Sequence, residues 1–283
     1  MTGFARSELL ATPAWLAEEL SRDGVRLIDV RWRPDGTAAQ VFEAAHIPGA
    51  VHLDWRAELS DSPASDTEAP AIHLAAADRA AAAFSRAGIG DSASVVLYDD
   101  TVSMFAAWTW WALRAYGFES ARILDGGYPA WHASRRPVST ASLPHDTATF
   151  TPRANPRLRL STTDVRAMLG SPDVQLVDAR PAAEFKGFEG NARRLGHIPG
   201  AINVPVAGMH ERGLQTLRDA DQLRSQLHLA NVARGRRLVC YDGSGLGAAK
   251  LAFVLSLMGH DDVAVYDGGW SEWGDRLDLP VER

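Results

Sequence analysis

The segment "AAHIPGAVHL" at residues 44–53 returns as "LGHIPGAINV" at residues 195–204. Two further segments recur in the same order: "LIDVR" at 27–31 as "LVDAR" at 176–180, and "VVLYDD…GFESARILDGGYPAW" at 95–131 as "LVCYDG…GHDDVAVYDGGWSEW" at 238–273. The copies are separated by roughly 145 residues, which is one typical domain length. The chain is therefore predicted to contain the same domain twice.

The stretch between the copies, residues 133–160, is rich in Pro, Ser and Thr and has little apolar periodicity, as is typical of a connecting segment. We predict a first domain over residues 1–140, a linker over 141–158 and a second domain over 159–283. In each copy, short β-branched apolar runs alternate with helix-like segments such as "MFAAWTWWALRAYG" and "AAKLAFVLSLMG". This alternation predicts an α/β fold of two tandem domains, each a small, mainly parallel sheet flanked by helices.

Composition excludes several classes of partner. The chain has 283 residues, of which 46% are hydrophobic and 23% charged, and its formal net charge is −6. No cluster of Lys and Arg is present that would follow a phosphate backbone, so nucleic acid is not expected as a partner. The N-terminus lacks a basic start followed by an apolar run, and no segment approaches the roughly 20 apolar residues of a membrane span. We expect no membrane association and a cytoplasmic location.

Cysteine and histidine usage bears on metals and cofactors. Cys240 is the single cysteine, so the chain can form neither an intrachain disulfide nor a cysteine-based metal cluster. The nine histidines are scattered without ligand-like spacing. We expect no metal site and no cofactor.

The segment "YDGSGLGA", residues 241–248, lies between the apolar run at 238–240 and the helix-like "AKLAFVLSL". A glycine-rich turn between a strand and a helix commonly holds an anion or a reactive side chain. Asp242, an acid, stands at the beginning of this turn.

These segments resemble the rhodanese family, and their tandem arrangement resembles its two-domain sulfurtransferases, which act on thiosulfate or 3-mercaptopyruvate. The resemblance rests on the two "HIPGA" segments, the two "DGG[YW]" turns, the "D-[VA]-R" strand ends and the "GSG" loop. It implies two similar domains with an active site in the cleft between them, carried by the second domain, the first being a non-catalytic copy. It also implies a small anionic sulfur compound as substrate and a thiophilic acceptor, which can be a protein.

The loop departs from the family pattern, which resembles Y-C-G-S-G-V-T-A. Asp242 occupies the catalytic cysteine position, and Gly247 replaces a threonine. By the same resemblance, the substrate-binding loop positions are Gly243, Ser244, Gly245, Leu246 and Gly247. Sulfur transfer needs a nucleophile that holds the sulfur as a persulfide, which a carboxylate cannot do. We therefore predict that activity is lost or much reduced.

Three interpretations of this centre remain open. In the favoured one, Asp242 accepts the loop N–H groups, fills the anion cradle and caps the following helix. In the second, Asp242 is itself a nucleophile, although phosphoryl enzymes of that kind also need metal-binding acids. In the third, Cys240 carries sulfur, although it lies inside a strand, where cysteine is usually an inert small hydrophobe.

Supporting residues have a functional and a structural interpretation each. The resemblance implies that Arg180 binds the anionic head of the substrate; alternatively it pairs with Asp178 or a loop carboxylate. It implies that Ser244 works with His46 and an acid, whereas His46 can equally fix its own turn, as its repeat His197 would. Asp35 is the nearest upstream carboxylate but is out of register, so we do not assign it.

Two functions from different classes follow. The first is a thiosulfate or 3-mercaptopyruvate sulfurtransferase with residual activity or an unusual centre. The second is a non-catalytic protein of the same fold that binds an anion or a partner in the cleft. The remaining conspicuous side chains are interpreted structurally: Trp108, Trp110 and Trp111 as core or domain-interface residues, and Arg193 and Arg194 as solvated surface.

Overall fold

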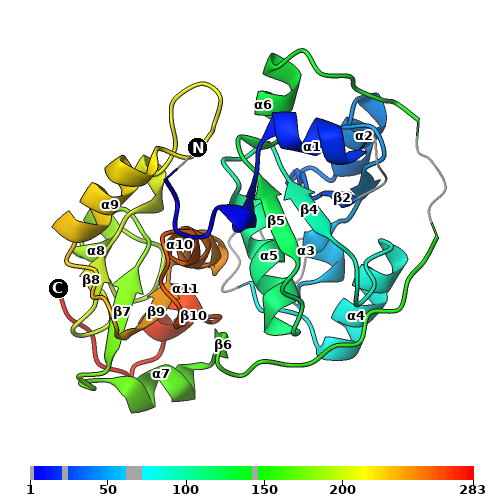
Figure 1. Ribbon diagram of the computed structural model, residues 1–283. Helices are drawn as coiled ribbons and strands as arrows, with labels where there is room; N and C mark the ends of the chain where they lie inside the picture. The colour runs from blue at the N-terminus through cyan, green and yellow to red at the C-terminus, as the bar shows by residue number, and fades with distance from the viewer. Residues whose placement is uncertain (1–2, 21–24, 62–71, 142–145) are drawn as a thin grey trace.

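Two α/β domains lie side by side in the computed structural model, which describes residues 3–20, 25–61, 72–141 and 146–283 (Figure 1). The blue-to-green part of the chain forms one domain and the green-to-red part the other, with helices α5 (Met104–Ala115) and α10 (Leu246–Leu257) between the two sheets. The predicted duplication is therefore visible as two bodies of the same architecture.

Each domain has a five-stranded parallel sheet, and the two sheets have the same strand order. The first is ordered β1-β5-β4-β2-β3 and the second β6-β10-β9-β7-β8, and every pairing is parallel. The strands of the first sheet are β1 (Leu10–Ala11), β2 (Arg26–Asp29), β3 (Val51–His52), β4 (Val95–Tyr98) and β5 (Ala121–Leu124). Those of the second are β6 (Arg159–Leu160), β7 (Val174–Asp178), β8 (Ile202–Asn203), β9 (Arg237–Tyr241) and β10 (Val263–Tyr266). The predicted fold class is confirmed.

Helices cover the faces of both sheets, which explains why the central strands β4 and β9 are buried over nearly their whole length. The first domain has η1 (Ser7–Leu9), α1 (Pro13–Leu20), α2 (Ala38–Ala44), α3 (Trp55–Glu58), α4 (Ala77–Arg86), α5 and α6 (Gly127–Ala133). The second has α7 (Thr162–Met168), α8 (Ala182–Phe185), η2 (Val206–Gly208), α9 (Ala220–Leu229), α10 and α11 (Gly269–Asp275). Ser161 and Asp164 form a capping box at the start of α7, as "STTD" predicts.

The interface between the domains is built on α5 and α10. Trp110 meets Phe253 edge-on with ring centroids 5.1 Å apart, and Trp108, Trp110 and Trp111 are all buried. The prediction of core or interface positions for these tryptophans is confirmed. Because α10 is buried nearly all round, the loop at its beginning lies at the meeting of the two domains.

A short segment of each domain also forms hydrogen bonds with the other domain. The Ile72 N–H donates to the Ser244 carbonyl (2.8 Å) and the Leu74 N–H to Asp267 Oδ2 (3.2 Å). In the opposite direction, the Leu217 N–H donates to Asp125 Oδ1 (2.8 Å). Asp125 and Asp267 open the two "DGG" turns, so the repeat extends to the contacts that join the domains.

The connecting segment lies against the first domain. Residues 142–145 of the expected linker are outside the described residues, and beyond them the Arg153 N–H donates to the Tyr116 carbonyl (2.9 Å) while Phe150 is buried. The boundaries at 140 and 159 remain predictions. Within the part of the chain that the structure describes, every helix is too short or too polar to cross a membrane.

Candidate active-site loop

The loop of residues 242–245 joins β9 to α10 at the carboxyl end of the second sheet. Its position is fixed by the pairing of Tyr241 with Asp178 in β7 and by Gly245, whose φ of +104° is in the region that favours glycine. The loop therefore meets the helix N-terminus with its amide groups turned inward, which is the geometry of an anion cradle.

The Asp242 side chain fills this cradle. Oδ1 accepts the Gly245 N–H (2.5 Å) and Oδ2 accepts the Gly247 N–H (2.9 Å), and the residue is 9% exposed. Burial raises the pKa of Asp242, while the N–H groups of Gly245, Gly247 and Ala248 act in the opposite direction. The carboxylate thus supplies, from inside the fold, the negative charge that an anionic ligand would otherwise bring to these N–H groups.

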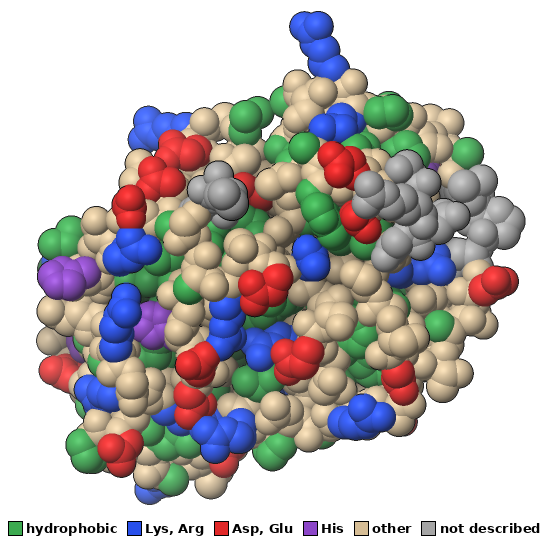
Figure 2. Space-filling view, in the orientation of Figure 1, with side chains coloured by type: hydrophobic (Ala, Val, Ile, Leu, Met, Phe, Trp, Pro, Cys, Tyr) green, Lys and Arg blue, Asp and Glu red, His purple; other side chains and the backbone are tan. Residues whose placement is uncertain are grey.

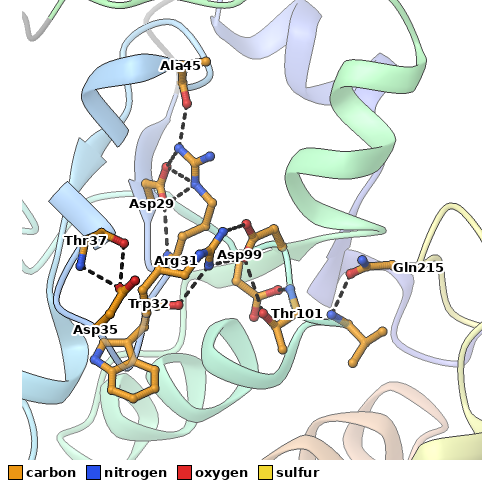
Figure 3. A network of polar contacts seen from close by, with 12 residues as sticks. Asp29, Arg31, Trp32, Asp35, Thr37, Ala45, Asp99, Thr101 and Gln215 are labelled. Carbon is orange, nitrogen blue, oxygen red and sulfur yellow. Dashed lines mark hydrogen bonds and ion pairs between the residues drawn. The ribbon is translucent and has the colours of Figure 1, made fainter. Parts of the chain in front are cut away.

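The first domain repeats this arrangement at Asp99, which follows β4 (Figure 3). Its carboxylate accepts four backbone N–H groups, those of Thr101, Ser103, Phe105 and Ala106, at 2.8–3.1 Å. Asp99 is 1% exposed and burial raises its pKa. Both loops therefore hold an internal carboxylate, and the one at Asp99 is the more completely bonded.

The other loop residues are placed by backbone contacts. The Gly243 carbonyl accepts the backbone N–H (3.1 Å) and the hydroxyl (2.6 Å) of Ser271, and the Ser244 carbonyl accepts the Ile72 N–H of the first domain. Leu246 is the first residue of α10. The loop is held from both domains, and the Ser244 carbonyl is one of the atoms that join them.

The Arg180 side chain forms an ion pair with Asp178. Its Nε lies 3.0 Å from both carboxylate oxygens, its Nη2 donates to Asp178 Oδ2 (2.6 Å) and to the Gly196 carbonyl (2.8 Å), and the guanidinium stacks over Trp270. Arg180 is 3% exposed. The structure therefore shows the structural pairing; the substrate-binding role implied by the resemblance remains a prediction.

The same pair occurs in the first domain. Arg31 binds Asp29 and donates to the Ala45 carbonyl (2.8 Å), as Figure 3 shows. The first domain is predicted to be the non-catalytic copy, yet it has the same Asp–Arg contact. The pair therefore belongs to the architecture of the domain.

His46 is fully buried and fixes its own turn. Nδ1 lies 2.7 Å from the Phe42 carbonyl, Nε2 lies 3.3 Å from the Ala141 carbonyl, and the ring stacks on Phe42. His197 repeats the contact, with Nδ1 2.8 Å from the Phe185 carbonyl. Because both ring nitrogens are directed at backbone carbonyls, the geometry favours the turn-fixing interpretation. The substrate-binding role that the resemblance implies for His46 remains a prediction.

Ser244, His46 and Asp35 do not form a hydrogen-bonded triad among the described residues. Asp35 binds the backbone N–H and hydroxyl of Thr37 on the surface of the first domain (Figure 3). No side-chain hydrogen bond links Ser244 with His46 in the described part of the chain. The structure thus supports leaving Asp35 unassigned.

Cys240 lies inside the second sheet. It is 0% exposed and is paired with Val177 on one side and Val265 on the other. Burial, followed by the charge of Asp242, raises the pKa of its thiol. A thiol that is both buried and protonated cannot attack a sulfur donor in this conformation.

Arg194 requires a correction. The sequence suggested a solvated side chain, but its guanidinium donates to the carbonyls of Gly274 (3.1 Å), Leu279 (2.7 Å) and Trp273 (2.9 Å). It also donates to the Arg276 carbonyl. Planar donors that converge on four carbonyls clamp the C-terminal segment to the loop before "GHIPGA". Arg193 is exposed, as expected.

Two buried ionisable residues at the interface were missed by sequence reasoning. Lys250, in the second turn of α10, is 2% exposed, and burial lowers its pKa to about 8 while Asp99 raises it. His210 is 9% exposed, and burial and the charge of Lys250 lower its pKa to about 3. A lysine inside the apolar run "AAKLAFVLSL" was the signal available for the first of them.

The described residues contain no group of three or more His, Cys, Asp or Glu side chains that could hold a metal ion. The chemistry available at the loop is therefore that of a buried carboxylate, backbone amides and a serine hydroxyl.

Comparisons with known proteins agree with the duplicated architecture. The family model described as a rhodanese-like domain matches residues 12–134 and again residues 161–276. The 3-mercaptopyruvate sulfurtransferase of Escherichia coli (strain K12) is 33% identical over 276 residues, 95% of each chain. The putative thiosulfate sulfurtransferase SseB of Mycobacterium tuberculosis is 35% identical over 290 residues, 99% of this chain and 98% of the relative.

A solved structure gives the same result. The crystal structure of SseA from Escherichia coli, titled as a 3-mercaptopyruvate sulfotransferase, superimposes with a TM-score of 0.80 at 31% identity. The match covers 93% of this chain and 99% of that one. The similarity therefore extends over both domains and includes the loop at their junction.

Proposed function

The chain belongs to the rhodanese family, and we propose that it is a sulfurtransferase-type protein in which Asp242 occupies the position of the sulfur-carrying cysteine. Transfer of sulfane sulfur from thiosulfate or 3-mercaptopyruvate to a thiophilic acceptor is then lost or much reduced. One observation carries this proposal: the Asp242 carboxylate binds the amides of Gly245 and Gly247, the groups that would stabilise a thiolate or a persulfide.

The chemistry of the carboxylate limits what the loop can do. A thiolate attacks the outer sulfur of the donor, forms an S–S bond and releases the remainder of the donor as an anion. A carboxylate oxygen does not hold sulfur in this way. It also repels an anionic donor at close range, and this repulsion is strong in a buried site.

The non-catalytic alternative, a protein that binds an anion or a partner at the cleft, is supported by the second internal carboxylate at Asp99. An anion would compete with Asp242 for the same amides, so a partner protein is the better candidate for that function. By similarity to its relatives, we also propose small anionic sulfur compounds as the ligand class, a protein thiol as a possible acceptor class, and a cytoplasmic location.

The decisive experiment restores the family residue. Sulfur transfer to cyanide is measured with thiosulfate and with 3-mercaptopyruvate for the unmodified protein, Asp242→Cys and Cys240→Ala, with Asp99→Cys as the matched control in the other loop. We expect activity in Asp242→Cys alone, accompanied by a persulfide on the new cysteine detected by mass spectrometry. Turnover by the unmodified protein that disappears in Cys240→Ala would contradict the proposal and identify the strand cysteine as the carrier.

A further inference from the structure

A pocket lies at the end of the second domain that is remote from the loop. Its volume is about 250 Å³, and its lining consists of Arg224, Leu227, His228, Val232, Arg234, Met258 and His260. We call it the Arg234 pocket. It adjoins a second pocket of about 290 Å³ that shares Arg234, Met258 and His260. Because the 12-residue helix α10 begins at the loop and ends here, the two sites are about 18 Å apart.

The floor of the Arg234 pocket is apolar. Leu227, on α9, is buried, and Val232 and Met258 are partly buried and pack on the main core cluster. Leu229, at the end of α9, is 81% exposed beside it. In Figure 2, His, Lys or Arg, Asp or Glu and apolar side chains are mixed on the left half of the face, over α9. The cations at the pocket itself are the lining residues Arg224 and Arg234. The pocket thus offers apolar surface bordered by cations.

The acids near this rim are already paired. Asp221 binds Arg224, and Asp261 binds Arg6. Asp262, which lines the adjoining pocket, is held by Arg157 (2.7 Å) and Arg237 (3.6 Å).

Arg234 is different from these arginines. Among the described residues its guanidinium has no hydrogen bond and no ion pair, although it lines both pockets. Its charge acts on His260, whose pKa is lowered by burial and then by Arg234, with Asp261 opposing. Arg234 is exposed, so a solvent-accessible cation without a partner among the described residues borders the apolar floor.

Helix capping does not account for this cation. Both helices that end at the pocket close their last carbonyls with backbone amides: the Val232 N–H donates to the Leu227 carbonyl (3.0 Å) after α9, and the His260 N–H donates to the Leu255 carbonyl (3.0 Å) after α10. Arg234 is therefore available to a group from outside the chain.

We propose that the Arg234 pocket binds a small monocarboxylate with an apolar tail, the carboxylate on Arg234 beside His260 and the tail over Leu227, Val232 and Met258. The planar guanidinium matches a carboxylate with two parallel hydrogen bonds. The apolar floor selects a ligand with a hydrocarbon part over a compact, strongly hydrated anion such as sulfate. The site is independent of the loop chemistry at Asp242.

The experiment uses the full chain and a series of acids of increasing length: acetate, butyrate and hexanoate, with hexylammonium as the probe of opposite charge. Binding is followed by the ring resonances of His260 and His228 in NMR spectra. Because each buried methylene strengthens binding about fourfold, we expect hexanoate, which has two more methylenes, to bind roughly tenfold more tightly than butyrate. Hexylammonium is expected not to bind.

The variant Arg234→Gln tests the charged contact. It should weaken hexanoate binding at least about tenfold, while Arg166→Gln, an exposed arginine of α7 on the same domain, should leave it unchanged. Bound hexanoate should also raise the pKa of His260, because an anion opposes the effect of Arg234. Equal affinities along the acid series would reduce the site to a surface ion pair and overturn the proposal. Undiminished binding in Arg234→Gln would overturn it equally.

Discussion

The Oδ2 atom of Asp242 accepts the N–H of Gly247 at 2.9 Å, and a Cβ atom on residue 247 would lie 2.9 Å from that same oxygen. The two residues are thus matched: the carboxylate occupies the space that a side chain at 247 would need. In the sequence, Asp for the family cysteine and Gly for the family threonine were two separate departures. In the structure the two departures belong to a single contact, because the Asp242 carboxylate fills the space beside residue 247.

This relationship predicts a coupling between the two positions. Alanine in a helix is favoured over glycine by about 1 kcal/mol, whereas overpacking beside Asp242 costs roughly 1–3 kcal/mol. We expect Gly247→Ala to be at least about 1 kcal/mol less favourable in the unmodified protein than in Asp242→Ala. Urea unfolding of the two single variants and the double variant gives this difference. Additivity within about 0.5 kcal/mol would show that the close approach does not constrain the loop.

Arg180 and Arg31 form a matched pair for a test of structural against ligand-binding roles. Replacing either by Met leaves a buried carboxylate, Asp178 or Asp29, without its cation, which should cost about 3–5 kcal/mol of unfolding free energy. We expect both variants to lose similar stability in denaturant unfolding. A stable Arg180→Met protein beside a destabilised Arg31→Met protein would indicate that Arg180 is retained for a ligand.

Cys240 is expected to be unreactive in the folded protein. Its burial within β9 and its raised pKa both suppress the thiolate. An aromatic disulfide reagent should therefore label no thiol in buffer and one thiol in denaturant, and thiosulfate should leave no persulfide on the protein. Rapid labelling of one equivalent in buffer would place the thiol at the surface and reopen its role as sulfur carrier.

The sequence was sufficient for the fold because the features that define it are local and repeated. Strand ends such as "LIDVR" and "LVDAR" occur at the same points of both copies, and each contains the same buried Asp–Arg pair. The contacts of Asp242 with the loop N–H groups were the favoured of three interpretations, because an acid before a helix N-terminus can accept its free amides.

The contacts between the domains were not predictable in the same way. The Leu74 N–H meets Asp267 and the Leu217 N–H meets Asp125, and these pairs are brought together only when the two sheets pack. The burial of Lys250 depends on that packing as well. Periodicity reports which face of an element is apolar, but not which partner covers it.

Two of these interface groups predict the response of stability to pH. The ring nitrogens of His210 are buried without a hydrogen-bond partner among the described residues, and its pKa in the folded protein is lowered to about 3. In the unfolded chain a histidine titrates near about 6.5. Between these values the unfolded state binds a proton that the folded state does not, so His210 lowers stability as the pH falls from about 6.5.

Asp125 acts in the opposite direction. Burial raises its pKa to about 6, against the ordinary 3.8, while the Leu217 N–H lowers it. Between these values the folded state holds the extra proton, so Asp125 raises stability as the pH falls. A fully linked group changes the unfolding free energy by about 1.4 kcal/mol per pH unit, and over about pH 4–6 the two slopes oppose each other.

Replacing either His210 or Asp125 should therefore expose the pH dependence of stability that the other one causes. We expect Asp125→Asn, which keeps an acceptor for the Leu217 N–H, to steepen the loss of stability on acidification. His210→Leu should reduce or reverse that loss. The measurement is the unfolding free energy in urea at pH 4, 5, 6 and 7, taken as the difference from the unmodified protein so that the other carboxylates cancel. A His210→Leu difference that does not change with pH would mean that His210 binds its proton equally well in the folded and unfolded states, which its burial and the neighbouring Lys250 charge argue against.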